Sequence, residues 1–303
     1  MIFSQLLTPW AILRRPSGPV LPMRTAWRKF VNVVMLSLTG VCALFTVSVL
    51  FLILGYLLWY GGKSLNWAFF TKLPTPVGES GGGMANAIVG SGKLLLLASL
   101  VGVPIGLLGG VYLAEFGGRT FSFVVRYTTD LLNGVPSIVM GIFAYTIIVL
   151  PMKHFSAFAG GMALGVMMVP IAVRTTEESL RAVPGVLREG ALALGASKWR
   201  TVATVVVPAA MRGIVTGVML TLARVAGETA PLLFTAFSNR FWSSGWNQPI
   251  ASLPVMIFTY AVGPYDDWHR QAWAAGLVLL GFVLLANIGA RFVVSRGISF
   301  RQV

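Results

Sequence analysis

The sequence predicts an all-α, polytopic membrane protein with about six transmembrane helices, and two observations support this fold class. Of the 303 residues, 56% are hydrophobic and only 11% are charged, with a mean hydropathy of +0.80. A soluble domain has roughly a quarter charged residues. Several apolar runs also approach or exceed the roughly 20 residues that a helix needs to cross hydrocarbon. Backbone groups cannot stay unpaired in lipid and strand-like alternation is absent, so the spanning segments must be helices.

Six apolar segments are expected to span the membrane. They cover residues 31–60, 84–113, 131–150, 158–173, 202–237 and 273–293. The fourth is short and must recruit flanking residues, and the fifth is interrupted by charge. The first is about 30 residues long, whereas the apolar core of a signal peptide has about 7–15, so we expect it to remain as a helix.

Lysines and arginines assign the sides of the membrane, because cytoplasmic loops are enriched in both. With the N-terminus inside, sixteen of them fall on the inner side and five on the outer side. The inner ones are Arg14, Arg15, Arg24, Arg28, Lys29, Arg119, Arg126, Arg174, Arg181, Arg188, Lys198, Arg200, Arg212, Arg291, Arg296 and Arg301, and the outer ones are Lys63, Lys72, Lys153, Arg240 and Arg270. The sequence therefore predicts two cytoplasmic termini, a basic N-terminal segment over 1–30 and a membrane domain over 31–303.

The same distribution explains the net charge of +14 without nucleic acid as a partner. No cofactor or metal is expected, because the single Cys42 can form neither an intrachain disulfide nor a cysteine-based metal site. The outer loops are expected at about 61–83 and 238–271. Residues 250–262 are too short to span, so they would form an interfacial or a re-entrant helix. The tryptophans of the second loop would form a membrane-interface belt or a docking surface for an extracytoplasmic binding protein.

Arg224 and Glu228 lie in the middle of the fifth apolar segment, and charges inside spans mark transport pathways by default. Their four-residue spacing would place them on one face of a helix. In a purely structural interpretation they form an ion pair that joins helices. In a functional interpretation Arg224 faces a pore and binds a tetrahedral oxyanion, because its planar fork offers two parallel donors.

Two further charged positions flank the predicted spans. Arg174 ends the fourth segment and would either anchor it by pairing with Glu177 or Glu178, or make a second anion contact on the exit side. Asp130 stands just before the third segment, where it would cap a helix or pair with Arg126.

A polar stretch between the fourth and fifth segments reads LREGALALGAS from Leu187 to Ser197. This pattern predicts a short helix, a glycine turn and a helix restart. It resembles the EAA loop of ABC importer permeases, with matching residues at Glu189, Ala191, Gly195 and Pro208, while Gly190 replaces the first alanine. The resemblance implies a cytoplasmic coupling loop over about 186–208 that docks into a cleft of an ATP-hydrolysing partner.

The string RVAGETAPLLFTA, from Arg224 to Ala236, resembles the signature of the PstA-type permeases of bacterial phosphate importers. Residues 110–116, 135–139 and 173–177 do so as well, and the similarity extends over about 25–294. The resemblance implies a type I ABC importer permease fold and a multi-pass subunit of the bacterial inner membrane that imports inorganic phosphate from the periplasm. It also implies intramembrane arginines, matching Arg174 and Arg224, with an acidic partner matching Glu228.

The same resemblance implies the partners. They are a PstC-type permease in a heterodimer, two PstB-type ATPase subunits and a PstS-type periplasmic phosphate-binding protein. The chain itself has no G-x-x-x-x-G-K-[ST] phosphate loop, so we expect no enzymatic activity here and ATP hydrolysis on a separate subunit.

Other functions stay open on sequence alone. The chain could be an ABC permease for another oxyanion, such as phosphonate or sulfate. It could be an ion-coupled secondary transporter in which Glu228 relays protons, although such a carrier needs no loop that docks an ATPase. A structural or signalling subunit is the third alternative.

Overall fold

The computed structural model describes residues 22–76, 79 and 81–299, which fall into two compact units, Met1–Gly55 and Tyr56–Val303. The first unit holds all but the last residue of helix α1 (Pro22–Tyr56), an apolar rod that contributes most of the first candidate span, Thr25–Ser64. Residues 1–21 of the predicted N-terminal segment lie outside the described part. The predicted division of the chain at residue 30 stays a prediction.

The second unit is helical throughout its described residues, apart from its connecting loops. Its elements are η1 (Leu57–Gly61), α2 (Gly62–Ser64), α3 (Trp67–Thr71), α4 (Ala85–Val111), η2 (Tyr112–Phe116), α5 (Arg119–Gly134), α6 (Ser137–Ala144), η3 (Tyr145–Val149), α7 (Leu150–Met152), α8 (Ala157–Arg181), α9 (Gly185–Ala193), α10 (Lys198–Thr201), η4 (Val202–Val206), α11 (Val207–Ala226), α12 (Ala230–Thr235), α13 (Leu253–Val262) and α14 (Asp266–Ser299). Elements marked η are single π-helical turns. In the described residues, five helices are long and apolar enough to cross a membrane, and one bent pair makes a sixth. This confirms the prediction of about six spans.

The third predicted span is not the continuous helix expected over 131–150. Helices α5 and α6 belong to a pair bent by 102° at the break between them. Val135 is extended, with φ −70° and ψ 129°, because the ring of the following proline disfavours the helical region at the preceding residue. Pro136 also lacks the N–H that would continue the helix.

The bounds of the fourth and fifth spans also differ from those predicted. As expected, the short fourth segment recruits flanking residues and becomes the 25-residue helix α8. The fifth does not run to residue 237, because α11 ends at Ala226 and a short irregular segment precedes α12. Pro208 lies in the first turn of α11, directly after the π-helical turn η4. The wider turn is a usual accommodation for a proline, which cannot donate to the helix ladder.

Glycines let α4 and α8 pack backbone to backbone. A Cβ atom added at Gly102 would lie 2.5 Å from the Cβ of Met168, and one at Gly110 would lie 2.5 Å from the Cβ of Thr176. Between them, a Cβ at Gly106 would overlap the Cβ of Ala172. Small residues at a four-residue spacing are typical of close helix pairs in membranes, where van der Waals contact supplies much of the association energy. We call this contact the glycine seam.

Three clusters of buried apolar residues follow one another along the bundle. The first joins α3, α4, α13 and α14, the second joins α4, α8, α11, α12 and α13, and the third joins α8 with η4 and α11. Helix α13 contributes Leu253, Met256 and Tyr260 to the first cluster. This short helix therefore packs into the protein core at its buried face.

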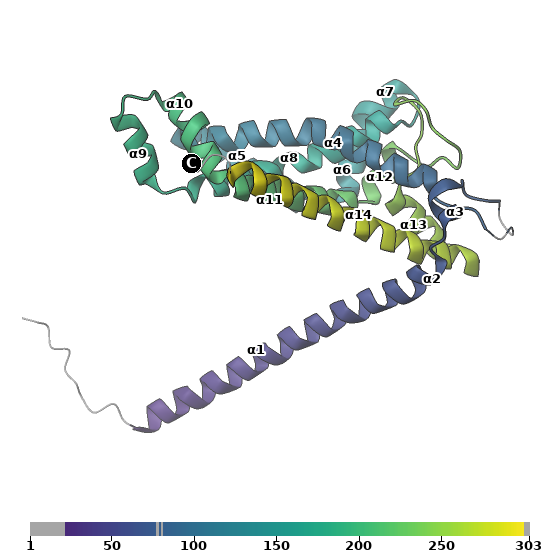
Figure 1. The fold of residues 1–303 in the computed structure, drawn as a ribbon, viewed down its shortest axis with the longest axis horizontal. Helices are drawn as coiled ribbons and strands as arrows, with labels where there is room; N and C mark the ends of the chain where they lie inside the picture. Colours follow the sequence, from purple (N-terminus) through teal and green to yellow (C-terminus); the bar gives the residue numbers. More distant parts are fainter. Residues whose placement is uncertain (1–21, 77–78, 80, 300–303) are drawn as a thin grey trace, which may run out of the picture. The chain divides into compact units, whose positions relative to one another are not determined.

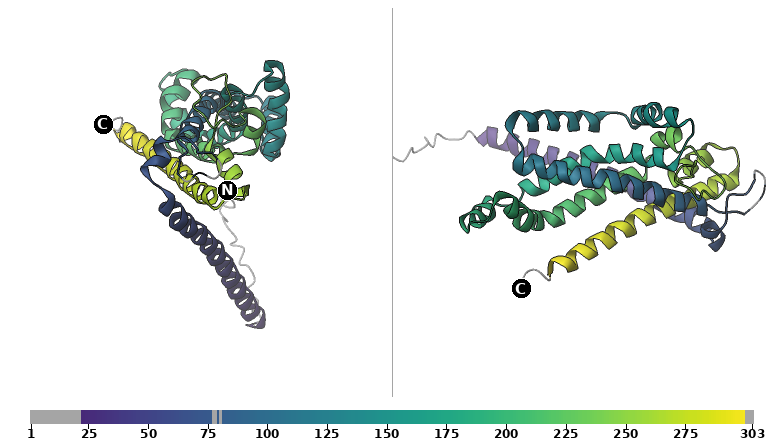
Figure 2. Two further views of the ribbon diagram at one scale, coloured as in Figure 1. Left: turned by 90° about the vertical axis from the view of Figure 1, so that its right-hand side faces the viewer. Right: turned by 90° about the horizontal axis from the view of Figure 1, so that it is seen from above.

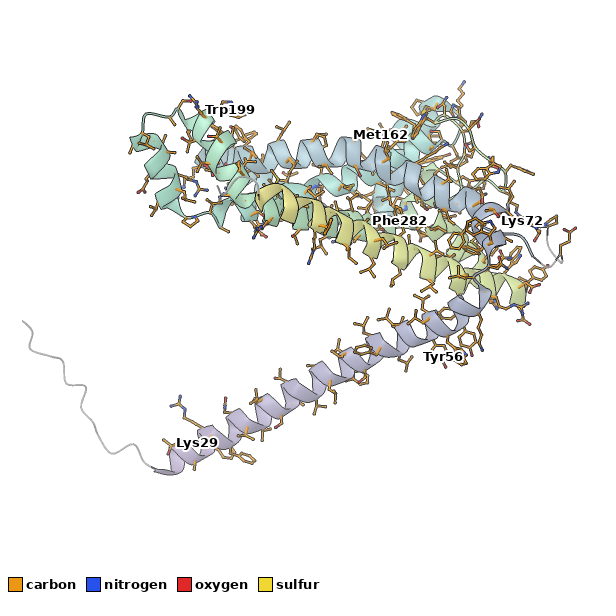
Figure 3. The ribbon with its side chains drawn as sticks, viewed as in Figure 1. Lys29, Tyr56, Lys72, Met162, Trp199 and Phe282 are labelled. Carbon is orange, nitrogen blue, oxygen red and sulfur yellow. The ribbon has the colours of Figure 1, made fainter. Side chains whose placement is uncertain are left out.

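Helices α9 and α10 stand at one end of the bundle, and α3 and α13 lie toward the other end (Figures 1 and 2). We call these ends the α9 end and the α13 end. Trp199, on α10, projects outward at the α9 end (Figure 3) and is 65% exposed. The described residues of the two predicted loop regions, about 61–83 and 238–271, lie at the α13 end.

The glycine seam can be tested with two substitutions in one helix. Gly106→Ala should destabilise the solubilised protein by about 1–3 kcal/mol, the usual cost of overpacking. Gly92→Ala is the matched control, because a Cβ there meets nothing within 4 Å. Thermal unfolding followed by circular dichroism should show a lower midpoint for Gly106→Ala only. Equal midpoints for the two variants would contradict close packing at the seam.

Candidate functional site

The breaks in the two interrupted spans lie side by side. Helix α6 follows the first break and α12 follows the second, and a Cβ added at Gly141 of α6 would lie 2.7 Å from the Cα of Pro231 of α12. Interrupted helices at membrane depth are tolerated only where the irregular backbone is buried in protein or lines a cavity. In transporters, such discontinuous helices typically form substrate sites.

A small pocket of about 20 Å³ lies where the two breaks meet. We call it the break pocket. It is lined by Leu132, Asn133, Val135, Met140, Met167, Pro170, Ile171, Arg224, Val225 and Glu228. The two charges that the sequence singled out therefore line one pocket, together with the end of α5 and the middle of α8.

The geometry of Arg224 and Glu228 differs from the expectation. They do not occupy one face of one helix, because α11 ends at Ala226 and Gly227 caps it. Glu228 lies in the break, and its N–H donates to the carbonyl of Val225 at 3.1 Å. In the described part of the chain, no ion pair joins Arg224 to Glu228. The structural interpretation of the two residues as a helix-joining ion pair is therefore wrong for this structure.

The exposure of Arg224 is informative because the residue lies within a candidate membrane span. The side chain is exposed on the isolated chain, near the end of a candidate span. An unpaired guanidinium that faces lipid within a span is costly. Arg224 is exposed and also lines the break pocket, which makes it a candidate for a polar contact outside this chain.

Asn133 is a polar member of the break pocket whose role the sequence did not indicate. Its Oδ1 atom is buried and has no hydrogen-bond partner in the described structure. A buried unsatisfied carbonyl is costly, so it calls for an explanation. Only the meeting of the two breaks reveals this position, since α5 and α11 are far apart in sequence.

Arg174 does not line the break pocket. Its Nε lies 3.0 Å from Oε1 of Glu178, and its Nη1 lies 4.0 Å from Oε2 of Glu177. This is the local pairing that the sequence offered as the anchoring alternative. The side chain is 41% exposed, so it keeps a solvent-facing edge.

Glu177 is the centre of a charge cluster, of which sequence reasoning indicated only the pairing with Arg174. Its side chain is 2% exposed, and its Oε1 accepts a hydrogen bond from Nε of Arg126 at 2.7 Å and forms an ion pair with Nη2 of Arg181 at 2.9 Å. Three guanidinium groups thus compensate the charge of one buried carboxylate, while its Oε2 atom has no hydrogen-bond partner in the described structure. The predicted pairing of Asp130 with Arg126 is wrong. Asp130 is exposed near the C-terminal end of α5 and does not cap a helix start.

The α9–α10 segment, residues 185–201, has the predicted helix, glycine turn and restart. Gly195 has φ +82°, a left-handed conformation that glycine adopts without strain. Its N–H donates to Leu192 at 2.9 Å and the N–H of Ala196 donates to Ala191 at 3.2 Å, the pair of bonds that defines a Schellman cap. The hydroxyl of Ser197 then accepts from the N–H of Arg200 and starts α10.

The outer surface of this segment combines charge with apolar side chains. Glu189 is exposed, Ala191 is half-buried, and no residue of α9 is fully buried. Val186 is 75% exposed, Leu194 is 91% exposed and Trp199 is 65% exposed. Exposed large apolar residues on a segment that also carries a carboxylate are typical of a protein-interaction surface.

At the α13 end, the loop before α13 is tied to the bundle by polar contacts. The Nζ of Lys93 donates to the carbonyl of Ser243 at 3.0 Å and lies 5.6 Å from the ring centroid of Trp246. The Nδ2 of Asn86 donates to the carbonyl of Asn239 at 2.7 Å.

In the described residues, no group of three or more histidine, cysteine or acidic side chains could hold a metal ion.

Comparison with known proteins places these features in context. A family model described as "Binding-protein-dependent transport system inner membrane component" matches residues 102–297. The chain is 46% identical to the phosphate transport system permease protein PstA of Yersinia pestis, covering 90% of this chain and 93% of the relative. It is 44% identical to the PstA of Haemophilus influenzae, covering 89% and 95%.

Solved structures agree at the level of the fold. A bacterial alginate ABC transporter, in complex with a periplasmic protein that binds an alginate pentasaccharide, aligns with a TM-score of 0.62 at 14% identity, covering 91% of this chain and 97% of that one. An inward-facing MetNI methionine ABC transporter aligns with a TM-score of 0.52 at 18% identity, covering 71% and 96%. These similarities confirm the predicted fold of ABC importer permeases.

Two glycines of the α9–α10 segment should respond oppositely to substitution. Gly195→Ala forces a side chain into the left-handed region and should destabilise the turn by about 1–2 kcal/mol. Gly190→Ala should stabilise α9 by up to about 1 kcal/mol, because alanine is the better helix former and a Cβ there meets nothing within 4 Å. Hydrogen exchange of the α9 amides should be faster in the first variant and slower in the second. The same direction of change in both variants would contradict the assigned turn.

Proposed function

Because the chain belongs to the PstA family of phosphate transport system permeases, we propose that it is the membrane-spanning subunit of an ATP-driven importer that moves inorganic phosphate from periplasm to cytoplasm. The observation that carries this proposal is the break pocket, in which an unpaired arginine and a carboxylate meet at two interrupted helices. The chain acts as a transporter permease in the bacterial inner membrane. ATP hydrolysis belongs to a separate subunit of the importer.

Arg224 is the proposed contact for the transported anion. Phosphate near neutral pH carries one or two negative charges, so its passage through hydrocarbon needs a compensating cation. The guanidinium fork supplies two parallel donors and stays charged at every physiological pH. Arg224 has no carboxylate partner within the described structure, so its donors are free to bind the substrate.

Glu228 is proposed to tune this contact. Transport requires binding that is favourable enough for entry and weak enough for release. A carboxylate in the same pocket opposes the positive charge of Arg224 and therefore limits how tightly an anion is held. Glu228 also accepts a hydrogen bond from a protonated phosphate oxygen, which fully ionised sulfate lacks. This chemistry favours phosphate over the alternative of a sulfate permease.

The exposure of Arg224 supports a heterodimer. The polar space that it faces needs a second wall, and a related PstC-type permease supplies that wall in our proposal. Arg174 is proposed as a second anion contact on the exit side, reached by exchange of its pairing with Glu178 for the anion. A PstS-type periplasmic protein delivers the phosphate at the α13 end, where Phe241 and Trp242 are exposed.

Orientation follows the charge distribution of the sequence. We propose that the α9 end and both termini lie in the cytoplasm. The coupling loop over about 186–208, with Glu189, Ala191, Gly195 and Pro208, then reaches two PstB-type ATPase subunits together with its counterpart on the second permease. The exposed apolar residues of the α9–α10 segment support this docking role. A secondary transporter would have no use for such a surface.

Substitution of Arg224 tests the proposed substrate contact. Arg224→Gln should reduce phosphate uptake by about 10²-fold or more, since a hydrogen-bonded charge contact is worth several kcal/mol in a dry site. Arg224→Lys should be only partly active, because the fork is lost, and Glu228→Gln should slow transport. Uptake of radiolabelled phosphate is measured in membranes with matched levels of assembled complex. Arg212→Gln, a basic residue of the same helix outside the pocket, is the control. Wild-type uptake in Arg224→Gln would refute the contact.

Substitution of Glu189 tests the docking role. Glu189→Ala removes an exposed carboxylate without disturbing α9, and Gly195→Pro removes the turn that α9 requires. Both variants should lower the amount of ATPase that co-purifies with the membrane subunits, while the spans remain inserted. Normal co-purification and normal transport in both variants would show that the ATPase docks elsewhere.

A further inference from the structure

Arg188 is the residue of α9 that reaches into the bundle. Its Nη2 lies 2.7 Å from Oε1 of Glu115, and its Nε lies 3.1 Å from the same oxygen. Its Nη1 donates to the carbonyl of Val183 at 2.6 Å, and Nη2 also donates to the carbonyl of Leu180 at 2.7 Å. One side chain therefore joins α9 to the end of α8 and to the turn that extends α4.

These partners make the contact strong and directional. Leu180 lies in the last turn of α8, where carbonyls lack partners within the helix and a positive charge is favoured. The side chain of Glu115 is 8% exposed and that of Arg188 is 24% exposed. Removal of one member of such a pair leaves a largely buried charge uncompensated, which is costly.

The same turn of the chain also contacts α10. The ring of Phe116 lies 6.1 Å from that of Trp199, between ring centroids, and Nζ of Lys198 lies 5.1 Å from the centroid of Phe116. Both halves of the α9–α10 segment are therefore attached to η2, at the end of α4. Glu189, next to Arg188, is exposed and has no ion pair in the described structure.

The helix α8, to which Arg188 is attached, also lines the break pocket. Pro170 and Ile171 of α8 line this pocket, and at the glycine seam the Cβ atoms of Met168, Ala172 and Thr176 of α8 lie against the backbone of α4. We propose that Arg188 and Glu115 act as positioning residues that transmit movement of α9 to α8 and α4, and so to the break pocket. This inference rests on the proposed role of the α9–α10 segment as the ATPase dock. In that arrangement Glu189 binds the ATPase and Arg188 carries its motion inward.

The experiment uses the complete importer, with both permeases, the ATPase and the binding protein, reconstituted into vesicles. Phosphate uptake, ATP hydrolysis and retention of the ATPase are measured for Arg188→Gln, Glu115→Gln and the double variant. Arg119→Gln is the matched control, because this basic residue is exposed at the start of α5 on the same end of the bundle. If the complex with Arg188→Gln fails to assemble, Glu115→Gln still tests the pair, because this variant keeps Arg188 and its hydrogen bonds to the carbonyls of Leu180 and Val183.

We expect the ATPase to be retained while the ATP hydrolysed per phosphate imported rises about tenfold, the usual size of a lost coupling between sites. The double variant should be no worse than the poorer single variant, because the two residues act as one unit. Arg188→Lys should restore part of the coupling by keeping the charge near the α8 carbonyls. An unchanged ratio in both single variants overturns the proposal, and so does loss of the ATPase from both. If Glu189→Ala instead leaves docking and transport intact, the dock itself is refuted, whatever the ratio in the Arg188 variants.

Discussion

The close approach of α4 and α8 is the contact on which the functional parts of this chain depend. Gly102, Gly106 and Gly110 leave no room on α4 for a side chain that faces α8, so the Cβ atoms of α8 lie directly against the α4 backbone and set the distance between the two helices. Helix α8 carries one wall of the break pocket near its middle and the Glu177 charge cluster near its end. Helix α4 continues into the turn that holds Glu115. A shift of either helix therefore moves the pocket, the charge cluster and the base of the α9–α10 segment together.

The bilayer imposes the second constraint, because every backbone group and every charge within it needs a partner or a polar space. The two interrupted spans satisfy this requirement by placing their breaks against each other. The charge cluster satisfies it by surrounding Glu177 with guanidinium groups. Arg224 is the exception, since it is exposed and unpaired in the described structure. A charge of this kind within a span marks a transport pathway by default, and our proposal assigns the transported anion as its missing partner.

Much of this architecture follows from local patterns in the sequence. Apolar runs of spanning length predicted the membrane helices, because burial of side chains in lipid depends on composition over one segment. The glycine turn at Gly195 was also predictable, since a left-handed residue between two short helices is a local requirement. Arg224 and Glu228 were recognisable as charges at membrane depth. Their separation onto a helix end and a break was not, because the spacing of two residues does not reveal where a helix stops.

Only the tertiary structure decided which residues far apart in the chain contact one another. Arg188 and Glu115 are 73 positions apart, and Arg126 and Glu177 are 51 positions apart, and no periodicity links them. The sequence by itself determined that this is a helical membrane protein with a helix, a glycine turn and a second helix between two spans and with charges inside the spans, because hydropathy and turn chemistry act over a few residues. The pairing of those charges, and the meeting of the two breaks in one pocket, depended on how whole helices pack, which is set by shape complementarity summed over the bundle.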